Sequence, residues 1–134
     1  EICDAVGDDN IFIFGMTTKE VDELWKQGYN STYYYNNNLE IRQIIETLKR
    51  GFAGKSFENI VDYLLTSSGV ADQYMCLADY ESYMNCYLHM DEVYSNKLLF
   101  NKMSLVNISE AGRFAADRSI KEYAERIWKI KPIK

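Results

Sequence analysis

Apolar residues recur along most of this chain at intervals of three and four, the spacing that places them on one face of an amphipathic helix. The clearest stripe follows Ser56, where Phe57, Ile60, Val61 and Leu64 mark successive turns of one face. Where a run is followed by glycine, we expect the helix to end there. The pattern predicts helices over residues 17–28, 39–51, 56–66, 79–94, 97–109 and 117–129.

Polar residues at the starts of these runs indicate how the helices are capped. Thr17 followed by Glu20 forms a capping box, and Gly28 is expected at the C-terminal end of that helix. Asp79 is the predicted N-cap of the long helix, whose buried face we expect to carry Tyr83, Met84, Tyr87 and Leu88. The run Tyr33 to Asn38 is expected to be a loop that leads into a cap. The break after the third helix is expected at Ser67-Ser68-Gly69.

Two short apolar runs interrupt the helical pattern. Ile11-Phe12-Ile13-Phe14 ends at Gly15 and reads as a buried strand, and Tyr74 to Ala78 is a second candidate strand. No hairpin turn pairs the two, so we expect their partners to lie outside this sequence, in a segment that precedes it. The predicted fold class is therefore mainly α with one or two short strands, the tail of an α/β domain.

Composition then narrows the function classes. The 134 residues are 47% hydrophobic with a net charge of −5, and acidic and basic residues are interspersed without a basic stripe for nucleic acid. No apolar run approaches the length of a membrane span, and the N-terminal residues lack the pattern of a signal peptide. We expect a soluble, intracellular protein. Cys3, Cys76 and Cys86 fit neither a disulfide framework nor a zinc site, so we expect reduced thiols.

Candidate catalytic motifs are weak when their spacing is examined. Gly54-Lys55-Ser56 resembles the end of a phosphate-binding loop, but Lys49 stands where that motif needs its first glycine, and a helix precedes it instead of a strand. A flexible turn is the preferred interpretation. His89 is the only histidine, which excludes a histidine metal cluster, and no acid is patterned beside it. We expect it at the surface or at a boundary.

Acidic and aromatic residues also have simpler explanations. Three carboxylate pairs could serve glycoside hydrolysis, but capping and solvation explain them: Asp8-Asp9, Asp79 with Glu81, and Asp91-Glu92. The eleven tyrosines could stack on sugar rings, although most fall at core spacing, so packing is preferred. Asp117-Arg118 at a helix start is read as a structural ion-pairing feature. Asn30-Ser31-Thr32 and Asn107-Ile108-Ser109 are treated as chance matches to a glycosylation signal.

Five groups of residues resemble, in order and spacing, the C-terminal end of the glycogen and starch (α-glucan) phosphorylases. The fifth group is the most specific. They are Asn10 to Met16; Gly28-Tyr29-Asn30 with Tyr34-Tyr35; Leu77 to Tyr83; Met103-Ser104 with Asn107-Ile108; and Gly112-Arg113-Phe114, Asp117 to Ile120, Tyr123-Ala124 and Ile127-Trp128.

This resemblance implies an enzyme that uses inorganic phosphate to cleave the terminal α-1,4 bond of a glucan and so releases glucose 1-phosphate in glycogen catabolism. The family is cytoplasmic, allosteric and homodimeric, and it holds pyridoxal 5′-phosphate on a lysine. Its fold pairs two Rossmann-like domains across a cleft, the GT-B arrangement. Residues 1–134 would then be the C-terminal part of the cofactor-bearing domain, and 117–129 its closing crossover helix.

The resemblance also implies that this chain carries no catalytic, cofactor-binding or metal-binding residue. The family's cofactor lysine lies in a Gly-Thr-Gly-Asn-Met-Lys motif just upstream of where Glu1-Ile2 maps. Lys102 follows Asn101 but lacks the rest of that motif. Two departures are conservative in role: Phe100 replaces a usual tryptophan, and Ala53-Gly54-Lys55 replaces a loop that contains Ser-Pro. We expect phosphate and glucan to be bound by upstream segments.

The last helix is expected to hold the two domains together. Ile120, Tyr123, Ala124, Ile127 and Trp128 form its apolar stripe, Ser119 with Glu122 supports its start, and Pro132 follows its end. The resemblance identifies its partner as the N-terminal domain of the same enzyme. The alternative is a non-catalytic helical interaction module derived from a phosphorylase tail, which would be favoured if the natural product began near Glu1.

Overall fold

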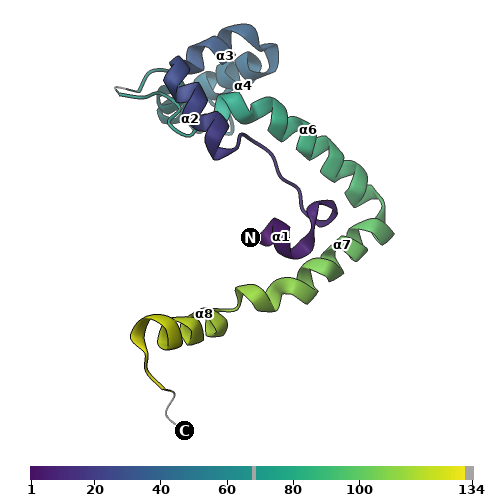
Figure 1. Cartoon of the computed structure of the whole chain (residues 1–134). Helices are drawn as coiled ribbons and strands as arrows, with labels where there is room; N and C mark the ends of the chain where they lie inside the picture. The colour runs from purple at the N-terminus through teal and green to yellow at the C-terminus, as the bar shows by residue number, and fades with distance from the viewer. Residues whose placement is uncertain (68, 132–134) are drawn as a thin grey trace. The chain divides into compact units, whose positions relative to one another are not determined.

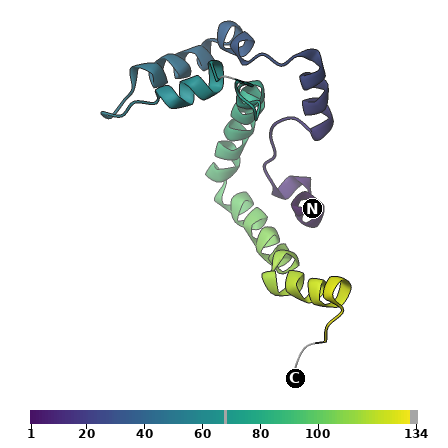
Figure 2. The same ribbon diagram turned by 90° about the vertical axis from the view of Figure 1, so that its left-hand side faces the viewer.

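The computed structural model describes residues 1–67 and 69–131, and these residues are mainly helical (Figures 1 and 2), which confirms the predicted class. Short 3-10 turns, η1 and η2, join some of the α-helices, and a π-helical turn, η3, follows the last. The elements are α1 (Ile2–Val6), η1 (Asp8–Asn10), α2 (Thr18–Gln27), α3 (Ser31–Asn37), α4 (Leu39–Arg50), α5 (Glu58–Leu65), α6 (Cys76–Ser95), α7 (Lys97–Glu110), η2 (Ala111–Phe114), α8 (Ala116–Glu122) and η3 (Tyr123–Trp128).

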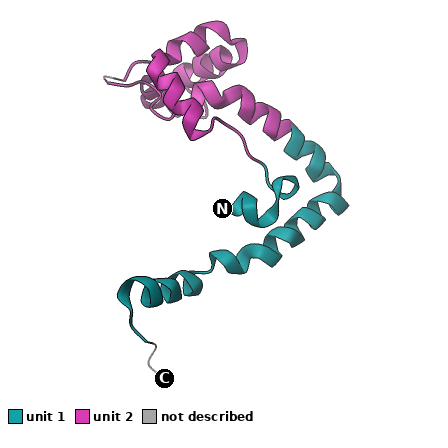
Figure 3. Ribbon diagram, in the orientation of Figure 1, with its two compact units in different colours: residues 1–12, 89–134 teal, residues 13–88 magenta. Residues whose placement is uncertain are grey.

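The chain divides into two compact units (Figure 3). Unit 2 is the continuous segment Ile13–Leu88, whereas unit 1 combines Glu1–Phe12 with His89–Lys134. Helix α6 contributes residues to both. In unit 1, α1 and η1 contact α7, and the side-chain amide of Asn107 donates hydrogen bonds to the carbonyls of Asn10, at 2.8 Å, and Met103.

The core of unit 2 forms where α4 and α5 meet the start of α6. Ile41, Ile45, Val61 and Leu77 are buried, with at most 8% of their surface exposed. Burial of such a side chain contributes about 1.5–3 kcal/mol. Partly buried residues from α3 to α6 complete the cluster: Tyr34, Tyr35, Leu48, Leu64, Leu65 and Tyr80. Of the stripe predicted after Ser56, Val61 and Leu64 join this core, whereas Ile60 is 41% exposed.

Several helix starts have side-chain caps. The capping box of α2 is confirmed, because Glu20 N–H donates to the Thr17 hydroxyl while Thr17 N–H donates to the Glu20 carboxylate at 2.7 Å. Hydrogen bonds to Thr17 lower the pKa of Glu20. Asn38 caps α4, and Asn96 caps α7 through the N–H of Leu99. These bonds satisfy N–H groups that lack partners within the first turn.

The segment predicted as a strand, Ile11 to Phe14, is unpaired in this structure. Ile11 has extended backbone angles, φ −142° and ψ 147°, but no β-ladder forms within residues 1–67 and 69–131. The described part of the chain contains one isolated antiparallel bridge, between Phe52 and Lys55. An extended segment becomes a strand only when a second segment takes up its backbone hydrogen bonds. The described residues supply no such segment, and a partner outside this sequence stays a prediction.

The second predicted strand, Tyr74 to Ala78, is wrong. Residues 71–74 form a turn, Met75 takes a left-handed conformation at φ 54°, and α6 begins at Cys76. The reason is a buried carboxylate: Asp72 accepts hydrogen bonds from the backbone N–H groups of Cys76 and Leu77. Met75 is 1% exposed, so its apolar character reflects burial at a helix start.

The loop predicted from Tyr33 to Asn38 is wrong over most of its length, because α3 occupies Ser31–Asn37. The Asn30 side chain accepts the Thr32 N–H at 3.0 Å and starts this helix. Tyr34 and Tyr35 then pack against the unit 2 core. Asparagine and tyrosine are poor helix formers in isolation, so packing has overridden their propensity. Asn38 caps the next helix, as predicted.

Asp79 does not cap α6, which begins three residues earlier. Its carboxylate accepts the N–H of Met16 at 3.0 Å, and the Ser82 hydroxyl accepts the N–H of Gly15 at 2.9 Å. These two bonds hold the extended segment against α6. The predicted buried face of α6 is also wrong at three positions: Tyr83, Tyr87 and Leu88 are 45%, 45% and 57% exposed.

The remaining boundaries agree closely with the pattern. The third helix begins at Glu58, not Ser56, and ends at Leu65; of the predicted break, Ser68 lies outside the described residues. The helix predicted at 117–129 is present as α8 followed by η3, with Lys129 at φ 53° ending it. Ala115 stands at the N-cap position without a side-chain bond, so neither Asp117 nor Ser119 caps this helix.

Glycine at position 15 is required by conformation and by space, which gives a first test. Gly15 has φ +87°, and a Cβ atom there would lie 2.9 Å from Asp79 Oδ2. Gly28 has nearly the same φ, +86°, with nothing within 4 Å. Gly28→Ala should cost about 1–2 kcal/mol of unfolding free energy through left-handed strain. Gly15→Ala should cost at least about 1 kcal/mol more, because the new methyl group displaces the Asp79 carboxylate from Met16. Denaturant titration measures both, and equal losses would contradict the Asp79 anchor.

Candidate functional site

The predicted catalytic candidates form no hydrogen bond or ion pair with one another among the described residues, although Asp8, Asp9 and His89 line one groove of unit 1. His89 lies in unit 1 with its ring edge-on to Phe12 at 5.8 Å, and no ion pair joins it to a carboxylate among the described residues. The Asp8 carboxylate accepts a hydrogen bond from the Cys3 thiol at 2.7 Å, and the Asp79 carboxylate accepts one from the Met16 N–H. His89 is exposed, as are Asp91 and Glu92. These groups have structural or solvent partners in place of one another.

Gly54-Lys55-Ser56 lies in a tight turn. The Lys55 N–H donates to the Phe52 carbonyl at 3.0 Å, and the Phe52 N–H donates back to the Lys55 carbonyl at 3.2 Å. A phosphate-binding loop would direct its N–H groups at the anion, but here the N–H of Lys55 is already bonded within the bridge to Phe52. The interpretation as a turn between helices is supported. Lys102 lines a unit 1 groove beside Asp8 and Asp9.

The three cysteines are unpaired, as expected. A hydrogen bond to Asp8 raises the pKa of the Cys3 thiol, and burial raises the pKa of the Cys76 thiol. Both effects disfavour the reactive thiolate. No group of three or more potential metal ligands occurs in residues 1–67 and 69–131, and no helix described there is long and apolar enough to cross a bilayer.

One polar residue that the sequence analysis missed organises unit 2. Asp72 is fully buried, at 0% exposure, and its carboxylate accepts the Tyr29 hydroxyl at 2.6 Å and the N–H groups of Cys76 and Leu77 at 2.9 and 2.8 Å. Burial and this bond together raise the pKa of the Tyr29 phenol. The signal was an aspartate four residues before Cys76, hidden by the strand assigned there. The Asp72 carboxylate caps the first N–H groups of α6 and forms a tertiary contact with Tyr29, and it does not face solvent.

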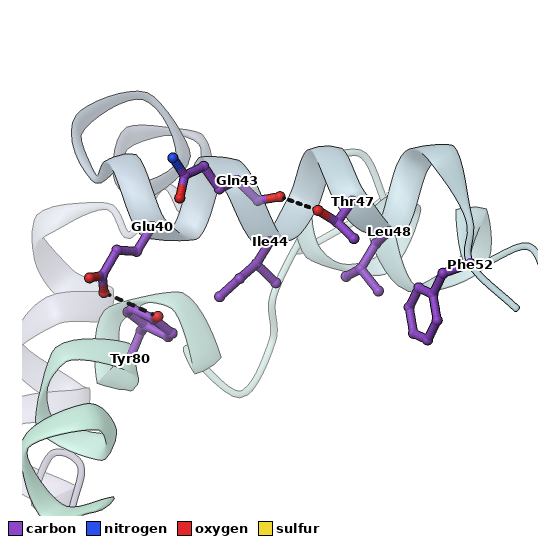
Figure 4. A pocket seen from close by; sticks show the side chains of 7 residues that line it. All are labelled: Glu40, Gln43, Ile44, Thr47, Leu48, Phe52 and Tyr80. Carbon is purple, nitrogen blue, oxygen red and sulfur yellow. Dashed lines mark hydrogen bonds between the residues drawn. The ribbon is translucent and has the colours of Figure 1, made fainter. Parts of the chain in front are cut away.

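A groove of about 510 Å³ runs along α4 in unit 2 (Figure 4). The side chains of Ile44, Leu48 and Phe52 point into it from successive turns, and the Tyr80 hydroxyl donates to Glu40 at 3.3 Å at its other end. Its lining comprises Glu40, Gln43, Ile44, Thr47, Leu48, Phe52 and Tyr80. Apolar side chains form most of the wall, with polar groups along one edge.

Unit 1 has a groove of about 480 Å³ between η1, the end of α6 and α7. Its centre is apolar, with Val93 and Met103 buried, and its rim carries Asp8, Asp9 and Lys102. No titratable pair at this rim forms a salt bridge among the described residues. The groove therefore lacks a convergent set of catalytic groups.

The closing helix exposes a large apolar stripe. Ile120, Tyr123, Ile127 and Trp128 are 54%, 48%, 65% and 55% exposed across α8 and η3. Arg118 forms an ion pair with Glu122 at 3.1 Å, as the structural interpretation of Asp117-Arg118 anticipates, although the acid is Glu122. A stripe of this kind on a helix normally packs against another element. Within the described residues it has no such cover.

Comparison with known proteins identifies the relationship. The sequence profile described as carbohydrate phosphorylase matches residues 1–130. Glycogen phosphorylases from Synechocystis sp. and Haemophilus influenzae are 35% and 38% identical over 133 residues, and each comparison covers 99% of this chain. The muscle form from Rattus norvegicus is 38% identical over 136 residues and 98% of this chain. The chain spans 16% of the length of each of these relatives.

The Asp72 contact predicts a specific dependence on alkaline pH. Tyr29 has a raised pKa when folded, so its contribution to stability is fully present below its unfolded pKa of about 10 and declines as the pH rises through the folded value. Tyr29→Phe should lower the unfolding free energy by about 1–2 kcal/mol near neutral pH. The gap to the wild type should close above about pH 10. Tyr33→Phe, at a residue 62% exposed, is the control. A gap that stays constant to high pH in thermal unfolding would contradict the contact.

Proposed function

The chain belongs to the carbohydrate phosphorylase family, and from this membership we propose that it is the C-terminal part of a glycogen (α-1,4-glucan) phosphorylase. The observation that carries the proposal is the match over residues 1–130 together with relatives named glycogen phosphorylase. The enzyme would use inorganic phosphate to cleave the terminal α-1,4 bond of a glucan and release glucose 1-phosphate. The described residues would act as scaffold for that reaction.

The catalytic groups are proposed to lie in the remainder of the polypeptide. Pyridoxal 5′-phosphate would supply its phosphate group to the proton transfer when bound to a lysine, and no lysine of this sequence stands in the required Gly-Thr-Gly-Asn-Met-Lys context. Lys102 borders a groove whose rim also carries the carboxylates of Asp8 and Asp9, a setting that repels a phosphate. The cofactor therefore belongs to another segment in this proposal.

The closing helix is proposed to bind the N-terminal domain of the same enzyme. Four apolar side chains on one stripe are about half exposed, which is unusual for a helix that faces solvent. Trp128 is the largest of them, and large aromatic side chains contribute much of the binding energy at interfaces. Residues 117–129 would then cross back from the cofactor-bearing domain and hold the two sides of the cleft together. This role requires packing and no proton transfer.

The extended segment from Ile11 to Phe14 fits the same proposal. Ile13 and Phe14 are 62% and 50% exposed, and the segment has no β partner among the described residues. In a Rossmann-like domain it would join the parallel sheet as a strand, with its side chains covered on both faces. Residues 1–134 are accordingly proposed to be the C-terminal part of the second, cofactor-bearing domain of a homodimeric, cytoplasmic, allosteric enzyme.

Activity should require the longer protein. The full-length product, purified from its source, is expected to contain covalently bound pyridoxal phosphate and to release glucose 1-phosphate from glycogen and phosphate. The 134-residue chain alone is expected to show no phosphorolysis and to self-associate through its exposed apolar stripes. A full-length product that begins near Glu1 or lacks the cofactor would favour the alternative, a non-catalytic interaction module.

Trp128 tests the docking role directly. In the full-length enzyme, Trp128→Ala should lower the unfolding free energy by about 3 kcal/mol, because a buried indole is removed from an interface. Tyr74→Ala, at a residue 76% exposed for which no docking role is proposed, is the matched control. Thermal unfolding measures the effect alongside glucose 1-phosphate release. Loss of activity with unchanged stability would contradict a purely architectural role for the closing helix.

A further inference from the structure

The groove on α4 combines an apolar floor with a polar edge along one helix face. Glu40, Ile44 and Leu48 follow one another at intervals of four, so they lie in a row on successive turns. Nine residues of helix from Glu40 to Leu48 extend about 12 Å, and Phe52 lengthens the row beyond the helix end. Figure 4 shows the apolar side chains of this row pointing to the same side. The groove is therefore elongated and suits a chain-like ligand.

An aromatic platform closes one end of the groove. Phe52 stacks on Phe57 with ring centroids 4.5 Å apart and planes inclined by 22°, and the backbone bridge from Phe52 to Lys55 fixes the turn that carries it. The Phe52 side chain is nevertheless 53% exposed. A flat aromatic face that is held in place but left half open can stack on an apolar ring face without further ordering cost. Tyr80 supplies a second aromatic ring at the opposite end.

The polar edge can both donate and accept hydrogen bonds. Glu40 accepts from the Tyr80 hydroxyl through Oε2, which leaves Oε1 available. The Gln43 side-chain amide is exposed and makes no hydrogen bond within the described residues, and it offers two donors and one acceptor atom. The Thr47 hydroxyl donates to the Gln43 carbonyl and accepts from Arg50 Nη2 at 3.5 Å, which leaves it one further lone pair. Hydroxyl groups of a sugar need this mixture, since each is both donor and acceptor.

The charge of the groove favours a neutral ligand. Glu40 is its one charged lining residue, and no basic side chain appears in the lining that the structure describes. Arg50 Nη2 donates to the Thr47 hydroxyl from beside the lining, so the groove has one carboxylate and one neighbouring guanidinium. An anion site would instead gather several Arg, Lys or convergent N–H groups. An uncharged polyhydroxylated chain has apolar C–H faces for Phe52 and Tyr80 and hydroxyls for the polar edge. Tyr80 is the tyrosine in this lining, and Phe52 supplies the second aromatic ring.

We propose that the α4 groove binds a segment of α-1,4-glucan, with Phe52 stacking on a glucose ring and Gln43 and Glu40 bonding to its hydroxyls. This proposal rests on the proposed function for the choice of glucan. Glucan is a polymer, so the groove would hold one stretch of a chain and raise the effective concentration of its other parts near the enzyme. Binding here is non-covalent and needs no residue outside unit 2.

The test is affinity electrophoresis of the full-length protein in native gels that contain glycogen, supported by titration with maltoheptaose. Phe52→Ala should weaken glycogen binding about tenfold, the loss expected for one aromatic stack of about 1–1.5 kcal/mol. Gln43→Ala should weaken it severalfold and removes an exposed side chain with no packing role, so it remains informative if Phe52→Ala folds poorly. Tyr33→Ala, which removes a 62% exposed aromatic ring from α3, should bind as the wild type does.

The possible results distinguish the groove proposal from the proposed function. Unchanged retardation of both Phe52→Ala and Gln43→Ala, relative to Tyr33→Ala, would overturn the groove proposal even if the wild type releases glucose 1-phosphate. Conversely, a wild type that makes no glucose 1-phosphate but loses glycogen binding on these substitutions would overturn the proposed function and support the groove. Equal weakening by all three substitutions would indicate a general loss of structure and would also count against the groove.

Discussion

The carboxylate of Asp72 ties three separate segments of unit 2 to one buried point. It receives the Tyr29 hydroxyl from the connection between α2 and α3, and it receives the first N–H groups of α6. A buried carboxylate left without these partners would cost several kcal/mol, so the three segments must arrive together for the site to be stable. Asp72 itself sits at φ 51°, a strained conformation that the surrounding bonds hold in place. The start of α6, and with it the position of Leu77 in the core, follows from this contact.

The start of α6 then fixes the extended segment before α2. Asp79 and Ser82 lie one and two turns into that helix, and they hold the backbone of Gly15 and Met16. The Asp79 carboxylate bonds to the Met16 N–H and does not cap α6. The Asp72 carboxylate accepts the first N–H groups of that helix instead. One aspartate therefore determines where the helix begins, and the next determines what packs beside it. Phe14 packs edge-on against Tyr83, yet Ile13 and Phe14 stay 62% and 50% exposed, which is the physical basis for proposing a further partner elsewhere.

Sequence reasoning succeeded where a local pattern decides the structure and failed where a distant contact decides it. The capping box at Thr17 and Glu20 is local, as is the packing of Val61 and Leu64 from the stripe after Ser56, and both were predicted. The start of α6 depends on Tyr29, 43 positions from Asp72 in the chain, and no periodicity reports such a bond. The strand at Ile11 to Phe14 was predicted from its apolar residues with its neighbours expected outside this sequence, so the described residues leave that pairing a prediction. For the α4 groove, the row Glu40, Ile44, Leu48 was visible, whereas the Phe52 platform depends on the turn that brings Phe57 against it.

The exposed apolar residues of α7 bear on what surrounds this chain. Helix α7 buries Met103 on one face and leaves Leu98, Leu105 and Ile108 at 83%, 66% and 69% exposure on another. A helix with apolar residues on several faces is one that other elements enclose, because water would otherwise meet each face at a cost proportional to its area. The α4 groove differs from these surfaces in kind: α4 packs one face into the core, and its outer groove combines apolar side chains with bonding polar groups. The exposed face of α7 presents three large aliphatic side chains, whereas the α4 groove places hydrogen-bonding groups directly beside its aromatic rings.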